Sequence, residues 1–134
     1  MTLQYAVLLR NAQLDAIETH IGTSPVLEIR TGAPPANADA ADSGTVLATL
    51  TLPSDWLAAA ASGAKALAGT WQDTSADAAG TAGHFRIKTS GAVSKIQGTV
   101  TATGGGGDMT VDNAVFAAGQ SFSITSFTIT AGNA

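Results

Sequence analysis

The spacing of apolar residues changes once along this 134-residue chain, at Ser24-Pro25, and the change limits the folds available to it. Before this point, apolar residues recur every three or four positions, which is typical of one face of an α-helix. After it, apolar and polar residues alternate, which is typical of half-buried strands. The sequence therefore predicts an N-terminal helix in residues 1–24, packed on or projecting from a β domain formed by residues 25–134.

The helix is predicted over residues 3–21. Thr2 can cap its start, and Gly22 can adopt a positive φ just past its end, before Pro25 prevents continuation. The apolar seam contains Arg10 where a fully buried helix would carry an aliphatic residue, so we expect packing at an edge or across a subunit boundary. A helix lying on its own sheet is the commoner arrangement. For the alternative, a helix that contacts a partner, the contact residues are Val7, Arg10, Leu14 and Ile17.

Short alternating segments follow, separated by turns rich in Gly, Pro and Asp. In the first of them Leu27 and Ile29 are predicted to face the core, with Glu28 and Arg30 facing solvent. About seven such strands at a spacing near ten residues indicate a mainly β fold, an antiparallel β-sandwich or a jelly roll. The segments are residues 26–30, 45–52, 64–72, 84–88, 94–103, 109–113 and 121–130; in 84–88 the basic side chains His84, Arg86 and Lys88 are expected to point outward.

The last of these segments changes phase, because Phe122 and Ile124 share one parity whereas Phe127 and Ile129 share the other. A β-bulge near residues 125–126 would restore one inward face, and a strand buried on both sides is the alternative. The four glycines at 104–107 are predicted to form the connection between two strands.

The segment 31–44, TGAPPANADAADSG, has no core-sized side chain, and we expect it to be an exposed loop. Long ordered loops often serve function, so Pro34 and Pro35 are a second candidate contact with a partner.

Composition excludes several classes of function. Only 12% of residues are charged and the net charge is −4, so no basic groove for nucleic acid and no surface for an anionic membrane is expected. There is no cysteine. No apolar run approaches the roughly 18 residues of a membrane span, and the N-terminus lacks the features of a signal peptide, so we expect a soluble protein.

No catalytic constellation is apparent in the sequence. His20 and His84 lie on different segments without a ligand spacing, and the glycine run lacks the lysine of a phosphate-binding loop. Four aspartates, at positions 39, 42, 108 and 112, match no calcium-loop signature. We therefore expect no enzyme activity, no cofactor and no metal. Trp56 and Trp71 could stack on sugar rings, although core packing is the favoured role.

Three stretches carry a resemblance to a known group of proteins: LEIRTG with the prolines that follow it, GTWQDTSADAAGTAGHF at 69–85, and GTVTATGGGGDMTVDNAVFAAGQSFSITSFTIT at 98–130. They resemble small structural proteins that recur in tailed-bacteriophage and prophage genomes beside head and tail genes. The DMTVDN and AAGQS segments are the more specific parts, and no catalytic residue comes with them.

The resemblance implies a virion protein, and we expect a head decoration, or cement, protein that bridges capsomers. Its partners would be the major capsid protein, other virion proteins and further copies of itself, with a trimer as the working guess. A tail-associated or adaptor protein is the alternative within the virion. A host-glycan-binding module that uses Trp56 or Trp71 is the alternative from another class.

Overall fold

The computed structural model describes residues 3–131, which form one helix and ten strands. The predicted class is confirmed: the fold is mainly β, with an N-terminal helix and a curled, mostly antiparallel sheet that resembles a β-sandwich. Jelly-roll connectivity stays a prediction. The elements are α1 (Val7–Ile21), β1 (Val26–Thr31), β2 (Val46–Thr51), β3 (Ala64–Ala66), β4 (Trp71–Asp73), β5 (Gly80–Lys88), β6 (Ser94–Ala102), β7 (Met109–Val111), β8 (Val115–Phe116), β9 (Phe122–Ile124) and β10 (Thr128–Thr130).

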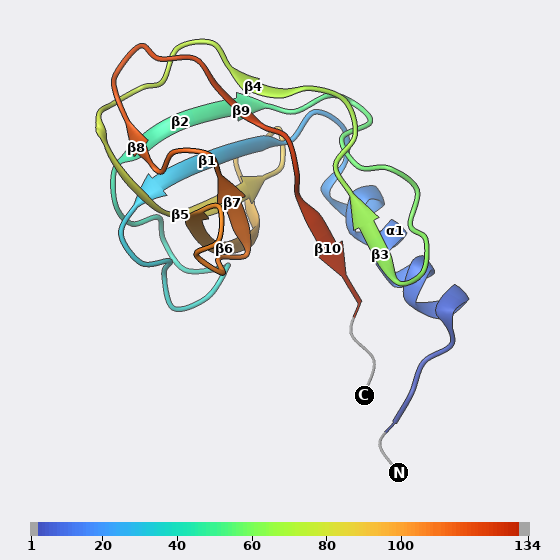
Figure 1. The fold of residues 1–134 in the computed structure, drawn as a ribbon. Helices are drawn as coiled ribbons and strands as arrows, with labels where there is room; N and C mark the ends of the chain where they lie inside the picture. Colours follow the sequence, from blue (N-terminus) through green and yellow to red (C-terminus); the bar gives the residue numbers. More distant parts are fainter. Residues whose placement is uncertain (1–2, 132–134) are drawn as a thin grey trace.

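The main sheet has the order β2-β1-β5-β6-β7, and β8 also pairs with β5. Figure 1 shows this sheet curling on one side of the molecule, while α1, β3 and β10 form an arm on the other side that carries both chain ends. Leu27 lies opposite Leu50 and Ile87, and Ile29 lies opposite Ala48 and Phe85. These side chains are all buried, so the inward parity predicted for residues 26–30 and 84–88 is confirmed.

A chain of aromatic rings fills the centre of the core. The ring centroids of Trp56 and Trp71 lie 6.1 Å apart, those of Trp71 and Phe127 5.7 Å apart, and those of Phe127 and Phe85 5.5 Å apart. Trp56 Nε1 donates to Gly22 O, and Trp71 Nε1 donates to the carbonyls of residues 56 and 68. Both indoles are therefore buried with their polar atoms satisfied, which makes core packing favourable.

Strand β7 departs from the expected antiparallel arrangement, because it runs parallel to β6, with Val100 opposite Met109. Parallel neighbours usually need a long crossover, yet here only residues 103–108 connect the two strands. The turn lies directly against β6. A Cβ on Gly105 would come within 2.7 Å of Thr101 Cβ, and one on Gly107 within 2.9 Å of Thr101 N. The glycine run thus forms the predicted connection, and it also allows the chain to return along its own strand.

Substitution of Gly107 tests this role. We expect Gly107→Ala to lower the free energy of unfolding by about 1–3 kcal/mol, because the added methyl group would overlap the backbone of Thr101. Gly91→Ala is the matched control, since its Cβ would meet only Thr89 Oγ1 at 3.7 Å. Urea unfolding of the two variants measures the difference, and equal stabilities would show that the turn does not need glycine at 107.

The phase change in residues 121–130 has a different origin from the predicted bulge. β9 pairs with β4, whereas β10 pairs with β3, and residues 125–127 carry the chain from one pairing to the other. Phe122, Ile124 and Phe127 are all buried, because the strand partner changes at the point where the parity changes. The bulge prediction was wrong.

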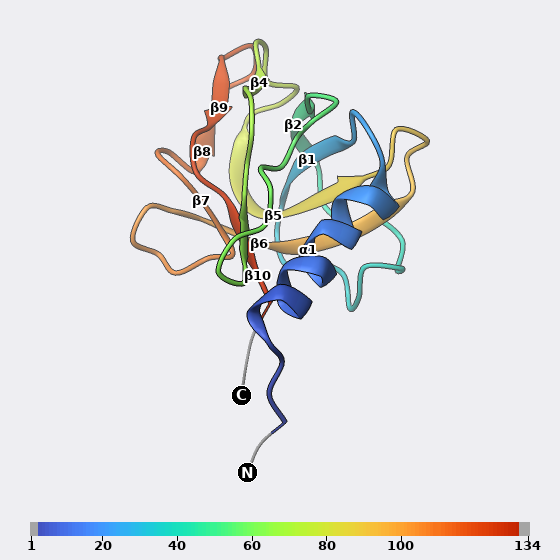
Figure 2. The same ribbon diagram turned by 90° about the vertical axis from the view of Figure 1, so that its right-hand side faces the viewer.

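Helix α1 is shorter than predicted, since it begins at Val7 after an extended Ala6 that makes no side-chain cap. Thr2, the expected cap, lies outside the described residues. At the other end Gly22 has φ +91°, as expected for the residue that ends the helix. Figure 2 shows α1 lying along one side of the strands, and its seam residues Leu14 and Ile21 are buried. The helix therefore packs on its own chain.

Polar contacts also fix α1 to the segment before β3. Asn11 Oδ1 accepts from Gly63 N at 2.9 Å, and Asp15 Oδ1 accepts from Ala60 N at 3.2 Å. The guanidinium of Arg10 lies over Gly63 and donates to Ala131 O at 3.3 Å. Helix α1, β3 and β10 are thus joined within the arm.

Candidate functional site

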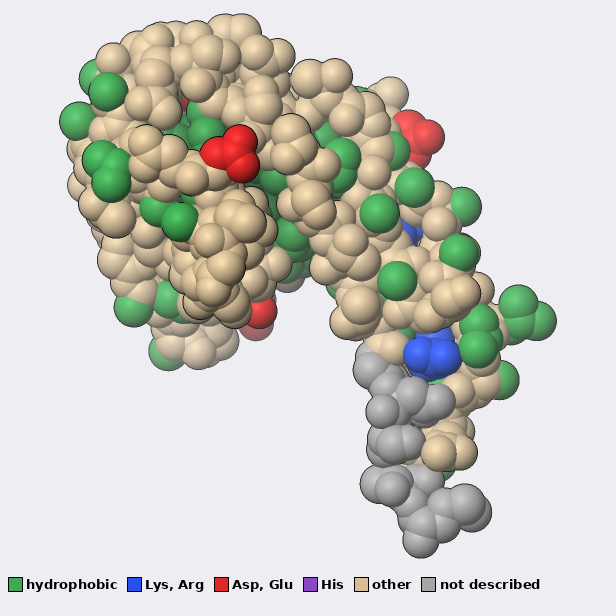
Figure 3. Space-filling view, viewed as in Figure 1, with side chains coloured by type: hydrophobic (Ala, Val, Ile, Leu, Met, Phe, Trp, Pro, Cys, Tyr) green, Lys and Arg blue, Asp and Glu red, His purple; other side chains and the backbone are tan. Residues whose placement is uncertain are grey.

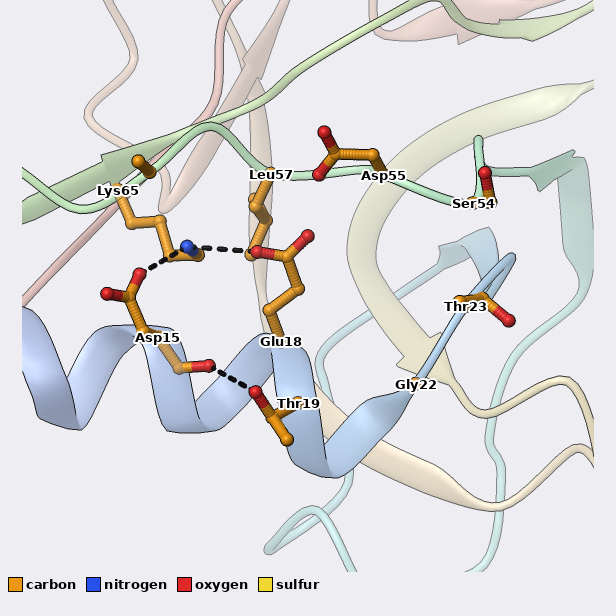
Figure 4. A pocket seen from close by; sticks show the side chains of 10 residues that line it. Asp15, Glu18, Thr19, Gly22, Thr23, Ser54, Asp55, Leu57 and Lys65 are labelled. Atoms are coloured by element: carbon orange, nitrogen blue, oxygen red, sulfur yellow. Dashed lines mark hydrogen bonds and ion pairs between the residues drawn. The ribbon is translucent and has the colours of Figure 1, made fainter.

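A cavity of about 590 Å³ lies between the C-terminal half of α1 and the segments around residues 54–65. Figure 4 shows the Lys65 ammonium between the carboxylates of Asp15 and Glu18. The Nζ–O distances are 2.6 Å to Asp15 and 2.9 Å to Glu18, and Lys65 is only 2% exposed. Ser54 and Asp55 line the same cavity from the chain that follows β2.

The electrostatics of this cavity keep Lys65 protonated. Burial lowers the pKa of Lys65, but the hydrogen bonds and charges of Asp15 and Glu18 outweigh it and raise that pKa above its usual value. The hydrogen bond from Lys65 in turn holds the pKa of Asp15 below its usual value. A nucleophilic or basic lysine needs a lowered pKa. Lys65 is therefore a structural contact between β3 and α1.

Replacing Lys65 tests this interpretation. A raised pKa in the folded state gives stability that is fully present below pH 10.5 and is lost as pH rises through the folded pKa. We expect Lys65→Met to stay within about 1 kcal/mol of the wild type at pH 7, because the side chains of Asp15 and Glu18 are 52% and 23% exposed and can be hydrated once the ammonium is gone. Urea unfolding between pH 9 and 12 should show a smaller alkaline loss for the variant. Equal alkaline losses would contradict the assignment.

A second charged cluster covers the outer face of the main sheet. Asp42 accepts from Arg86 at 2.8 Å, from Lys88 at 2.6 Å and from Arg30 at 3.1 Å. Glu28 pairs with Lys88 at 2.6 Å and with Arg30 at 3.1 Å. We call Glu28, Arg30, Asp42, Arg86 and Lys88 the outer charge cluster.

The loop at residues 32–44 lies over this cluster. Arg86 donates to the backbone carbonyls of residues 37 and 40 as well as to Asp42, and Gln97 Nε2 donates to Pro35 O at 2.7 Å. The expectation that His84, Arg86 and Lys88 would face solvent was therefore wrong in one respect. They do lie on the face opposite the core, but all three are buried. The hydrogen bond from Lys88 is the main cause that holds the pKa of Asp42 below its usual value.

The four helix residues that were predicted to contact a partner differ in how far they are buried. Leu14 is buried, Ile17 packs against the core, and Arg10 is held by Gly63 and Ala131, so these three side chains make internal contacts. Val7 alone of the four has a largely exposed side chain. The seam faces inward because its apolar residues complete the protein's own core. Leu14 therefore has no surface to offer a partner, while a partner contact through Val7, Arg10 or Ile17 stays a prediction.

The predicted contact loop is also less free than expected. Pro34 and Pro35 are half-buried, and Pro35 O is bound by Gln97. The loop lies on the sheet because its backbone carbonyls supply acceptors for buried cationic and amide side chains. Its outer surface still reaches solvent, so a partner contact there stays a prediction.

The glycan alternative is wrong as it was assigned. Trp56 and Trp71 are 0% and 1% exposed, and each indole is in contact with other core rings or backbone carbonyls. A sugar stacks on an accessible ring face, and neither ring offers one.

The surface feature that sequence reasoning missed is the start of α1. Of the seven large hydrophobic side chains that are exposed in residues 3–131, five lie between positions 3 and 9, so exposed apolar surface is concentrated there. Figure 3 shows hydrophobic side chains on the arm as well as on the sheet side of the molecule. The five residues, which we call the apolar helix end, are Leu3, Tyr5, Val7, Leu8 and Leu9.

The apolar helix end presents apolar groups on more than one side of the helix. Successive helical residues are rotated by about 100°, so Val7, Leu8 and Leu9 place apolar groups over more than half of the helix circumference. A helix that is apolar all round is normally buried. Leu8 is nevertheless 81% exposed. The run of apolar residues at 7–9 is the sequence signal for this surface, whereas the three-four spacing indicates only the seam.

No group of three or more His, Asp or Glu side chains is gathered for a metal ion within residues 3–131. Asp42 belongs to the outer charge cluster, while Asp108 accepts hydrogen bonds from Thr99, so two of the four candidate calcium ligands have other partners. None of the helices in this described range is long and apolar enough to cross a bilayer.

Comparison of the chain with protein-family models gave no match. Comparisons with curated proteins and with solved structures likewise gave no match.

Proposed function

We propose that this chain is a structural protein of a tailed-bacteriophage particle and acts as a decoration, or cement, protein on the head. The observation that carries the proposal is the apolar helix end, which holds five of the seven large hydrophobic side chains that are exposed in residues 3–131. Residues 69–85 and 98–130 resemble small virion proteins, so we infer that the partner of this surface is another virion protein. The partner class is the major capsid protein, together with neighbouring copies of the chain in a homo-oligomer.

The physical basis of a cement protein is mass action. A protein that binds only the assembled shell lowers the free energy of that shell and not of its free subunits. Such binding needs apolar area that becomes buried at a junction, with little charge to desolvate. Residues 3–9 carry no charged side chain, and only 12% of the chain is charged.

The charged groups of the molecule support a structural role as well. Lys65 is held protonated between two carboxylates, and the outer charge cluster binds its own covering loop. Both sites stabilise the chain itself, which favours a non-catalytic protein.

The binding test uses capsids from particles that lack this protein. We expect purified protein to co-sediment with them, and the double variant Leu8→Ser, Leu9→Ser to bind at least about 100-fold more weakly, because two buried leucines each contribute about 1.5–3 kcal/mol. Val93→Ser is the matched control, since Val93 is exposed on the distant β5–β6 hairpin. Equal binding of the double variant and the control would exclude the apolar helix end as the contact.

Copy number separates the head from the tail. Hundreds of copies per particle are expected for a decoration protein, whereas a few copies would indicate a tail-associated or adaptor protein. If the protein bound no capsid, and particles without it resisted heat and chelators as well as the wild type, the cement role would be excluded.

A further inference from the structure

One edge of β10 has no strand beside it. β10 pairs with β3 in a two-stranded sheet, and Leu67 N donates to Phe127 O, so the odd-numbered residues of 127–131 direct their backbone groups toward β3. In an antiparallel ladder the intervening residues face the other way. The backbone N–H and C=O groups of Thr128 and Thr130 therefore point away from β3, and they have no hydrogen-bond partner in the described part of the chain.

An apolar groove lies along this free edge. A hollow of about 330 Å³ separates β10 from the main sheet, and Ile17, Ile96 and Ile129 are among the residues that line it. A second hollow of about 460 Å³, between α1 and β6, shares Ile17 and Ile96 with the first. All three isoleucines are only partly buried. Figure 3 shows the molecule hollowed between the sheet side and the arm.

The groove is suited to an uncharged strand. Asp108 is the one charged side chain among the described residues that line the hollow beside β10, and its carboxylate accepts hydrogen bonds from Thr99. A free strand edge binds an extended segment through backbone hydrogen bonds, while pockets beside the edge accept its alternate side chains. The occupant that fits is therefore an extended, uncharged segment with apolar residues at every second position.

The chain carries such a segment before its helix. Residues 3–6 lie outside any helix or strand, and Ala6 is extended, with φ −61° and ψ 152°. Leu3 and Tyr5 occupy alternate positions and are 73% and 39% exposed. Residues 3–9 contain no charged side chain. Figures 1 and 2 show this segment leading away from the body of the molecule, so it points away from the groove of its own chain.

We propose that residues 3–6 of one copy pair with the free edge of β10 in a second copy, with Leu3 in the groove beside Ile96 and Ile129. The contact is head-to-tail, so it joins copies into a closed ring or a filament. This inference rests on the homo-oligomer of the proposed function and names the surfaces that join its copies. Its test uses the isolated protein, so its failure would leave capsid binding through Leu8 and Leu9 open.

Two variants each remove one half of the contact. Thr128→Pro removes an N–H that β3 does not use, and proline is tolerated on a strand edge that faces solvent. Leu3→Asp places a charge in the apolar groove. In sedimentation velocity we expect the wild type to form oligomers and each variant to associate at least about tenfold more weakly. Thr128→Ala is the matched control, because it keeps the backbone N–H and should assemble as the wild type does.

A mixture of the two variants gives the sharpest result. Each variant retains the half that the other lacks, so we expect the equimolar mixture to form a dimer with one intact contact and nothing larger. Leu3 is largely exposed, so Leu3→Asp tests the contact even if the proline disturbs β10. A wild type that stays monomeric at the highest concentration reached, or Leu3→Asp oligomers equal to those of the wild type, would overturn the proposal.

Discussion

Trp71→Ala is expected to lower the free energy of unfolding by about 3–5 kcal/mol. Trp71 lies between Trp56 and Phe127 in the aromatic chain, and its truncation would leave a void that the neighbouring rings cannot fill without leaving their own contacts. It would also remove the donor that two buried carbonyls share. A domain of this size has only about 5–15 kcal/mol of stability, so the loss is a large fraction of the total.

Trp71→Phe is the control for this prediction, because it keeps an aromatic ring in contact with Phe127. We expect it to cost about 1–2 kcal/mol, chiefly from the lost hydrogen bonds. Urea unfolding followed by circular dichroism measures both variants. A Trp71→Ala protein within 1 kcal/mol of the wild type would mean that the aromatic chain is not the centre of the core.

Asp42→Ala is expected to have the second largest effect, a loss of about 3 kcal/mol at pH 7. Asp42 is the common acceptor for Arg30, Arg86 and Lys88. Its removal would leave the buried Arg86 without a carboxylate partner, and would leave Glu28 as the only counter-charge for Arg30 and Lys88. The value is placed at the low end of the range for buried pairs because the Asp42 side chain is 35% exposed. Asp39→Ala, on the same loop but exposed, should change the stability by less than about 0.5 kcal/mol.

The pH dependence gives this prediction a second readout. The lowered pKa of Asp42 means that its contribution is present above pH 3.8 and is lost as pH falls through the folded pKa. The wild type and Asp42→Ala should therefore converge in stability between pH 4 and pH 2. A difference that stayed constant over this range would show that the carboxylate charge is not the stabilising group.

The sequence alone determines much of the fold, because local patterns report local geometry. The change of period at Pro25, the end of the helix at Gly22 and the glycine connection at 104–107 all predict elements that the structure contains. Parity also places Leu27 and Ile29 inward correctly. The parallel pairing of β6 and β7 could not be predicted, since it depends on backbone contact between Gly107 and Thr101 rather than on any periodic signal.

The sites were harder to predict than the fold for a related reason. Alternation puts Glu28, Arg30, Arg86 and Lys88 on the face opposite the core, but it does not show that residues 32–44 cover that face. The loop has small side chains and is held mainly through its backbone carbonyls. Because every residue has a backbone carbonyl, the sequence does not indicate that the loop binds to the sheet. Lys65 gives no signal either, because its partners are about fifty residues away.

The most direct test of the account is a cryo-electron microscopy map of the particle that contains this chain. The proposal predicts hundreds of copies on the head, with Leu3, Leu8 and Leu9 buried against a neighbouring subunit. It also predicts that no reactive group of a neighbouring subunit lies opposite the Lys65 cavity. A map in which residues 3–9 remain in solvent, while another surface makes every contact with the particle, would contradict it.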